Sequence, residues 1–177
     1  LHTSAAYSAT VYVYKPDGSY WDAEVNRYRK TLPDTGTYTV VVAGTNYASN
    51  GTYDLYYFKG DDSVSSGTLI SGQASTTSLD ENGMVSYQFY GVAGQGVKVH
   101  TSSGYSATIL GYEPDGSYWT YGTNRFSKTL PSTGTYNLLI MGANYASNGT
   151  LGVNFVRGDD SVNEGTLVSG SERAGNL

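Results

Sequence analysis

Apolar and polar residues alternate along two segments in the middle of the chain. Residues 84–90 read Met-Val-Ser-Tyr-Gln-Phe-Tyr, and residues 96–100 read Gly-Val-Lys-Val-His. A period of two residues is typical of β strands that bury one face. The same reading predicts further strands at residues 105–113, 117–121, 124–130, 135–142 and 149–157, with a short strand at 166–169.

Turn-forming residues separate these segments. The sequence Pro114-Asp115-Gly116-Ser117 places proline at the first turn position and glycine where a positive φ is needed, which predicts a hairpin. Asn50-Gly51 and Asn148-Gly149 are also strong hairpin signals. Short strands with turns at this spacing predict an all-β protein, built from antiparallel β-sandwich modules of the jelly-roll type.

One block of sequence occurs twice. Residues 2–72 align with residues 100–170 at a constant offset of 98 without a gap, and 42 of the 71 aligned pairs are identical. The sequence therefore predicts two modules, residues 1–72 and residues 73–177. The first has no counterpart of residues 73–99 in this sequence, so we expect it to lack its opening strands. Exposed strand edges of this kind invite another chain to add a strand. The alternative is that the missing strands lie outside this sequence.

Composition narrows the class further. With 23 Gly, 18 Tyr and only 2 Met, the chain favours strands and turns over helices. The absence of Cys excludes disulfides and thiolate metal sites. The net charge of -5 argues against nucleic acid as a partner. Low charge density and the lack of a long apolar run predict a secreted, extracellular protein that does not insert into membranes, with any export signal removed or upstream.

Several short blocks follow one another in a recognisable order. They are Tyr87-Gln88-Phe89, Ala93-Gly94-Gln95, the Pro114 hairpin after Leu110, residues 130–136 (Leu-Pro-Ser-Thr-Gly-Thr-Tyr) and residues 147–150 (Ser-Asn-Gly-Thr). This order resembles the bacterial pre-peptidase C-terminal domain. The resemblance implies a β-sandwich of about eight strands that is appended to exported proteins and often linked to attachment or carbohydrate contact. No peptidase domain accompanies these blocks here.

Aromatic pairs follow the predicted hairpin in both copies. They are Tyr20-Trp21 and Tyr118-Trp119, with Tyr121 nearby. Neighbouring residues of a strand point to opposite faces, so one member of each pair should enter the core and the other should be exposed. An exposed ring beside Asn and Asp could stack on a sugar, which makes these five residues candidate carbohydrate contacts. Core or cross-strand packing is the favoured alternative.

Two acidic doublets are the candidate metal ligands. Asp61-Asp62 and Asp159-Asp160 lie in Gly-Asp-Asp-Ser loops, where carboxylates could hold Ca²⁺. A solvated turn is the favoured alternative because no calcium-loop motif completes the ligand set, and we expect no other cofactor. His2 and His100 occupy the same repeat position without a catalytic motif around them. We therefore expect no enzyme activity.

The sequence as a whole favours a non-catalytic, structural or adhesive repeat of an extracellular or cell-surface protein. Such a module would act as a stalk, fibre unit or surface-assembly unit, completed by strand exchange between chains. Its expected partners are further copies of itself or neighbouring repeats. The alternative is a carbohydrate-binding module that binds a polysaccharide through exposed Tyr and Trp.

Overall fold

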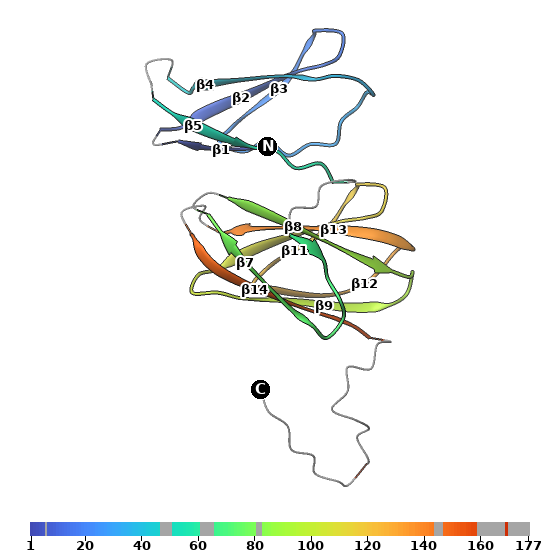
Figure 1. Cartoon of the computed structure of the whole chain (residues 1–177). Helices are drawn as coiled ribbons and strands as arrows, with labels where there is room; N and C mark the ends of the chain where they lie inside the picture. Colours follow the sequence, from blue (N-terminus) through green and yellow to red (C-terminus); the bar gives the residue numbers. More distant parts are fainter. Residues whose placement is uncertain are drawn as a thin grey trace. The chain divides into compact units, whose positions relative to one another are not determined.

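The computed structural model describes residues 1–5, 7–46, 51–60, 66–80, 83–143, 147–158 and 169. These residues form 14 strands and no helix, so the predicted all-β class is confirmed. None of the described segments is a helix able to cross a membrane. Contacts divide the chain into unit 1, Leu1–Lys59, and unit 2, Gly60–Leu177 (Figure 1).

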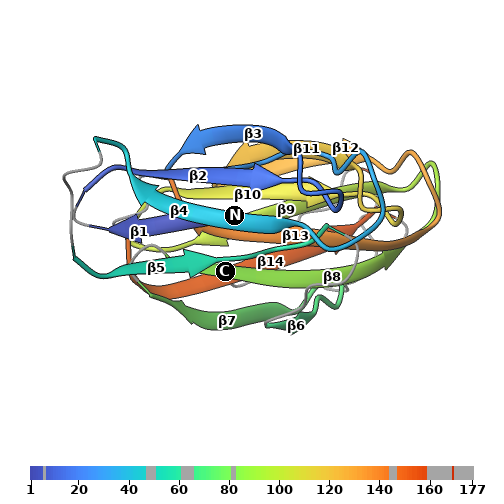
Figure 2. The same cartoon turned by 90° about the horizontal axis from the view of Figure 1, so that it is seen from above.

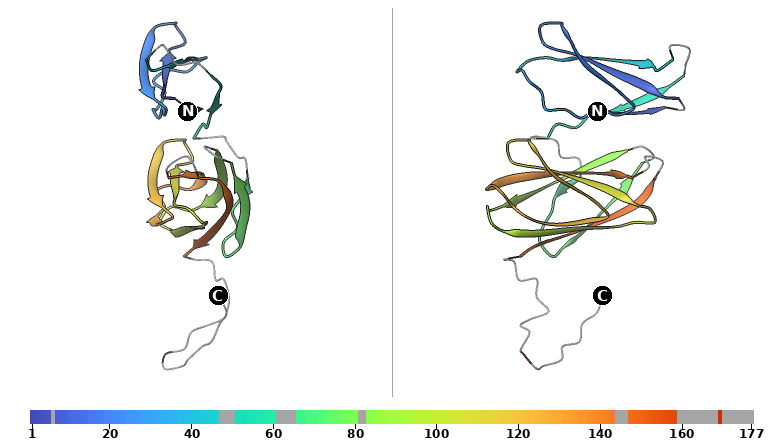
Figure 3. Two further views of the ribbon diagram at one scale, coloured as in Figure 1. Left: turned by 90° about the vertical axis from the view of Figure 1, so that its left-hand side faces the viewer. Right: turned by 180° about the vertical axis from the view of Figure 1, so that it is seen from behind.

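Unit 2 is a sandwich of two sheets. One sheet has the strand order β11-β10-β13-β8-β6 and the other the order β12-β9-β14-β7 (Figure 3, left). All pairings are antiparallel except that of β6 with β8. The strands are β6 (Gly67–Thr68), β7 (Ala74–Leu79), β8 (Met84–Gly91), β9 (Gly96–Ser102), β10 (Ala107–Tyr112), β11 (Tyr118–Thr123), β12 (Arg125–Thr129), β13 (Gly134–Gly142) and β14 (Gly149–Arg157).

The core of unit 2 fills the space between these sheets. Strand β8 contributes Tyr87 and Phe89, β13 contributes Leu138, and β14 contributes Leu151 and Val153. Along β9 every second residue is buried, as the alternation predicts. The strands expected at residues 84–90 and 96–100 are therefore present as β8 and β9.

Unit 1 has fewer strands and a smaller core. A three-stranded sheet has the order β3-β2-β4, and β1 pairs with β5 (Figure 2). Val11, Val13 and Tyr28 form its buried apolar cluster. Among the described residues, β4 has only β2 as a strand neighbour and β5 has only β1. The strands are β1 (His2–Ala5), β2 (Ala9–Tyr14), β3 (Tyr20–Val25), β4 (Thr39–Gly44) and β5 (Tyr53–Tyr56).

One of the predicted hairpins is present in the structure and another is not. The Pro114 turn does close a hairpin, because β10 and β11 pair directly and Gly116 has a φ of 83°. The hairpin predicted at Asn148-Gly149 is wrong. The strands on either side of this dipeptide, β13 and β14, belong to different sheets, so the segment crosses from one layer of the sandwich to the other.

The segment before β7 packs with unit 2, although the repeat assigns it to the first copy. Residues 67–68 pair with β8, and Leu69 lies in the core of unit 2. The N–H of Gly72 donates a hydrogen bond to the carbonyl of Phe155, 2.8 Å away. By contacts the chain thus divides after Lys59, whereas the repeat divides after residue 72, because the end of the first repeat adds a short strand to unit 2.

Candidate functional site: the open face of unit 1

The duplication assigns each strand of unit 1 an equivalent in unit 2. At the offset of 98 residues, β4 corresponds to β13 and β5 to β14. In unit 2, β8 pairs along β13 from Gly91 to Met84, and β7 pairs along β14. Residues 74–91 thus form a β arch, one strand in each sheet, that covers one edge of both sheets. Within the described residues of unit 1, no strand occupies the corresponding edges of β4 and β5.

The side chains next to these edges are more exposed in unit 1 than their equivalents are in unit 2. Leu55 is 42% exposed and its equivalent Val153 is 0% exposed. Tyr57 is 65% exposed, whereas the ring of Phe155 is 1% exposed. The residues of unit 1 whose equivalents belong to the core of unit 2 and which are exposed or only half-buried are Leu1, Leu32, Tyr38, Val40, Val42, Tyr53, Leu55 and Tyr57. We call this set the open face.

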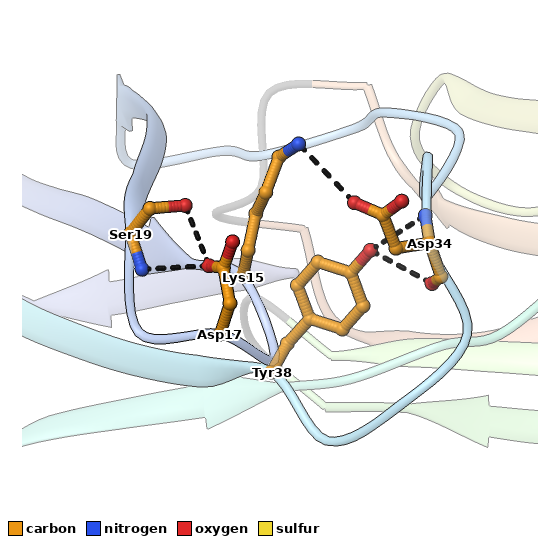
Figure 4. A network of polar contacts seen from close by, with 5 residues as sticks. All are labelled: Lys15, Asp17, Ser19, Asp34 and Tyr38. Atoms are coloured by element: carbon orange, nitrogen blue, oxygen red, sulfur yellow. Dashed lines mark hydrogen bonds and ion pairs between the residues drawn. The ribbon is translucent and has the colours of Figure 1, made fainter.

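A tyrosine at the open face is held by its own loop. The hydroxyl of Tyr38 donates to the carbonyl of Asp34 at 2.8 Å and accepts from the N–H of Asp34 at 3.0 Å (Figure 4). The Asp34 carboxylate in turn forms an ion pair with the ammonium of Lys15 at 3.1 Å. These contacts hold the ring of Tyr38 beside that of Trp21, with the ring centroids 5.7 Å apart and the planes tilted by 55°.

The second copy repeats this arrangement with different side chains. The hydroxyl of Tyr136 donates to the carbonyl of Ser132 at 2.7 Å and accepts from its N–H at 3.0 Å. Glu113, at the position of Lys15, accepts from the hydroxyl of Ser132 at 2.9 Å. The charge pattern differs, but the tyrosine keeps the same anchor. Sequence analysis missed this feature, although the repeated Thr-Gly-Thr-Tyr segment marks it.

The hairpin that precedes the aromatic pair is also built alike in both units. The carboxylate of Asp17 accepts from the N–H and the hydroxyl of Ser19, at 2.8 and 2.6 Å (Figure 4). These hydrogen bonds hold the pKa of Asp17 below its usual range. Asp115 accepts from Ser117 in the same way, with a lowered pKa. The local geometry of unit 1 is therefore that of a folded module.

The predicted aromatic candidates divide between surface and core. Tyr20, Tyr118 and Tyr121 are exposed. Trp21 packs against Tyr28 and Tyr38 in unit 1, and Trp119 packs against Phe126 and Tyr136 in unit 2. Both indole rings thus support the cores, and the structure does not gather the five candidates into one platform within either unit.

Neither the acidic doublets nor His100 forms a site within the residues that the structure describes. Asp61, Asp62, Asp159 and Asp160 lie outside the described residues, so calcium binding stays a prediction. His100 is exposed on β9. Among the residues that the structure describes, no group of three or more His, Asp or Glu side chains lies close enough to hold a metal ion.

Comparisons with known proteins give distant matches in solved structures. No family model matches the chain, and no curated protein matches it. A structure of PliG from Aeromonas hydrophila is 16% identical, covering 47% of this chain and 84% of its own, with a TM-score of 0.39. PliG from Salmonella Typhimurium is 18% identical, covering 53% and 99%, and a mutant of the Escherichia coli protein is 18% identical, covering 51% and 96%, each with a TM-score of 0.41.

These comparisons correct the function expected from the sequence. All three similar structures are described as periplasmic inhibitors of g-type lysozyme, not as structural repeats or carbohydrate-binding modules. We therefore retain neither the adhesive stalk or fibre unit nor the carbohydrate-binding module. The resemblance to the pre-peptidase C-terminal domain stays a prediction, and the likeness to solved structures is one of β fold.

Proposed function

We propose that the chain is a non-catalytic, exported module, and that unit 1 accepts added β strands on its open face. The observation that carries this proposal is the contrast between equivalent positions. Leu32 is 48% exposed and Leu130 is 1% exposed, and Tyr53 is 47% exposed where Leu151 is buried. Residues that form the core of one unit are thus at the surface of the other.

Strand addition suits this face better than a small ligand does. The uncovered edges of β4 and β5 present backbone donors and acceptors, and the side chains between them are apolar. An added strand gains main-chain hydrogen bonds from an edge and specificity from the pockets for its alternate side chains. Each Å² of apolar surface that it covers contributes about 25 cal/mol.

The polar groups beside the open face support a binding role without chemistry. Asp34 and Lys15 are paired with each other, and the hydroxyl of Tyr38 is used in anchoring its loop. The ion pair and the two hydrogen bonds position the ring of Tyr38 beside the other apolar side chains of the open face. Export is proposed from the Ser-, Thr- and Gly-rich composition and from the sequence resemblance described above.

A selection experiment tests this function without assuming a partner sequence. A displayed library of random peptides about 20 residues long is selected on the whole chain, and the enriched peptides are then tested on a Leu55→Asp chain. We expect enriched peptides that bind the chain and lose at least tenfold in affinity on Leu55→Asp. The control is Val156→Asp, at an exposed position of β14 in unit 2, which should leave binding unchanged. Enriched peptides that bind both chains equally, or no enrichment, would contradict the proposal.

A further inference from the structure

We infer that Asn148 is a site of spontaneous covalent modification, at which the side-chain amide becomes a carboxyl group through a cyclic imide with Gly149. The site belongs to unit 2 and does not depend on the open face of unit 1. The dipeptide closes no hairpin. It lies where the chain crosses from the sheet that contains β13 to the sheet that contains β14.

The reaction requires only an asparagine side chain, the next backbone nitrogen and water. The nitrogen of Gly149 attacks the side-chain carbonyl carbon of Asn148, and the new carbon–nitrogen bond closes an imide ring. The side-chain amide nitrogen leaves as ammonia and takes the proton that the backbone nitrogen gives up. Water then opens the ring at either carbonyl. One opening gives aspartate, and the other gives isoaspartate, whose main chain contains an additional methylene group.

Glycine after the asparagine favours ring closure, because it places no side chain beside the attacking nitrogen. A Cβ atom added to Gly149 would have no other atom within 4 Å, so neighbouring residues do not crowd the ring either. Gly149 also has a φ of 113°, which side chains rarely allow, so the fold retains glycine here. Of the asparagines that the structure describes, Asn148 is the one followed by glycine. Asn50 and Asn82 also precede glycine but lie outside the described residues.

Two asparagines of unit 2 show opposite environments. Asn148 is exposed and lies just before the first residue of β14, so strand pairing does not fix its backbone. Oδ1 of Asn124 accepts from the N–H of Ala107 at 2.7 Å, and its carbonyl oxygen accepts from the N–H of Thr101 at 2.7 Å. Arg125, and not glycine, follows Asn124. Conversion is therefore expected at Asn148 and not at Asn124.

Conversion places a new negative charge opposite an existing one. Gly149 pairs with Leu79 in the antiparallel ladder of β14 and β7. Asn148, one residue earlier, therefore comes opposite Asp80, one residue later, and Asp80 is exposed. Like charges directly opposite each other on neighbouring strands are destabilising. A carboxylate at position 148 should therefore weaken the pairing of β7 with β14, and salt should reduce this effect.

Isoaspartate also lengthens the main chain before β14. The register of β14 is fixed by the buried side chains of Leu151, Val153 and Phe155. A slip by one residue would move all three to the opposite face of the sheet. The additional methylene group is therefore accommodated before Gly149, while β14 keeps its place. Unit 2 should keep its fold and lose stability.

Peptide mapping by mass spectrometry tests the modification on the whole chain, incubated in neutral buffer made with heavy-oxygen water. We expect the peptide that contains Asn148 to exchange its amide for a labelled carboxyl group, as aspartate and isoaspartate, at least tenfold faster than the peptide that contains Asn124. The rate should rise with pH, because the attacking nitrogen must give up its proton. Asn148→Gln is the matched control. It keeps an amide but would need a larger ring, so it should stay unmodified over the same time.

Two results would overturn the site. One is conversion at Asn148 that is no faster than at Asn124. The other is an Asn148 that stays unmodified in the folded chain and converts only after unfolding in urea, because the fold would then protect it.

A stability measurement tests the place of the new charge. In a Trp21→Phe background, urea unfolding followed by Trp119 should show that Asn148→Asp destabilises unit 2 at low salt, and that adding Asp80→Asn restores the stability. An Asn148→Asp chain as stable as its parent would show that the carboxylates of residues 148 and 80 do not oppose each other.

Discussion

The ring of Phe89 lies flat against the ring of Tyr136, with 5.2 Å between their centroids. The tyrosine comes from the repeated part of the chain, and the phenylalanine comes from the segment that occurs once. Tyr38 repeats the tyrosine in unit 1 with the same anchoring hydrogen bonds. One module therefore shows the covered form of a surface that the other presents uncovered, and the two can be compared position by position.

Aspartate at equivalent positions should destabilise the two units to very different extents. Val153→Asp places an unpaired charge in the core of unit 2 and should lower its free energy of unfolding by more than about 4 kcal/mol. Leu55→Asp, at an exposed position, should cost about 1 kcal/mol or less in unit 1. Urea unfolding followed by Trp119 for unit 2 and by Trp21 for unit 1 measures both. Equal losses would show that Leu55 is a core residue.

Glycine 91 should be required for the packing of unit 2. Because a side chain there meets Leu130, Gly91→Val should lower the free energy of unfolding of unit 2 by about 1–3 kcal/mol. Gly96→Ala is the control, since a Cβ at that position meets no atom within 4 Å. Thermal unfolding of the two variants in the same background gives the comparison. A Gly91→Val protein as stable as the control would show that the contact with Leu130 does not require glycine at this position.

A buried hydroxyl in unit 1 should be dispensable. Within the described residues, the hydroxyl of Tyr28 is buried without a hydrogen-bond partner, and burial raises the pKa of this phenol. Phe126 occupies the equivalent position in unit 2. Removing an unpaired buried hydroxyl relieves its desolvation cost, so Tyr28→Phe should stabilise unit 1 by about 1 kcal/mol. Unfolding followed by Trp21 measures the change, and a clear destabilisation would mean that the hydroxyl has a partner in solution.

Acid should weaken unit 1 through Asp22. Its carboxylate accepts hydrogen bonds from Lys30 at 2.9 Å and from the N–H of Ala23 at 2.8 Å, and the contact with Lys30 is the main reason why the pKa of Asp22 lies below 3.8. A lowered pKa in the folded state stabilises the protein above the ordinary pKa, and this stabilisation is lost as the pH falls through the lowered value. Unit 2 has Thr120 at this position.

Carboxyl chemical shifts followed by nuclear magnetic resonance give the midpoint for Asp22. We expect a midpoint below 3.8 in the unchanged chain and a higher one in Lys30→Met. Lys30→Arg should keep the low midpoint, because it preserves the charge and the hydrogen bond. A midpoint that does not respond to Lys30→Met would contradict the role given to this ion pair.

Much of the fold could be predicted from alternation alone. Strands β8 and β9 were predicted because apolar and polar residues alternate along them, although Ser86 and Thr101 are buried and Tyr90 is exposed. Strand β7 was missed because Ala-Ser-Thr-Thr-Ser-Leu buries only its last residue and carries no apolar period. The hairpin expected at Asn148-Gly149 failed for a different reason. A turn dipeptide does not report which sheet the next strand joins, and that choice depends on tertiary packing.

The candidate site was predicted only in outline. The gap in the repeat predicted open strand edges in the first copy, but it did not indicate which strands would bear them. In the described residues of unit 1, β4 pairs only with β2 and β5 only with β1. Side chains on the open face could not be identified, because an apolar residue such as Leu55 looks the same in sequence whether or not a strand covers it. The anchor of Tyr38 through Asp34 is a backbone contact four residues away, which no motif in the sequence analysis described.

Amide hydrogen exchange on the whole chain, with and without a peptide selected on the open face, tests the central claim most directly. In the free chain, amides of β4 and β5 should exchange faster than those of the equivalent strands β13 and β14, which have neighbours on both sides. Saturating peptide should slow exchange in β4 and β5 and leave β3 and unit 2 unchanged. Equal protection of β4 and β13 in the free chain, or peptide-induced protection confined to other strands, would contradict the account.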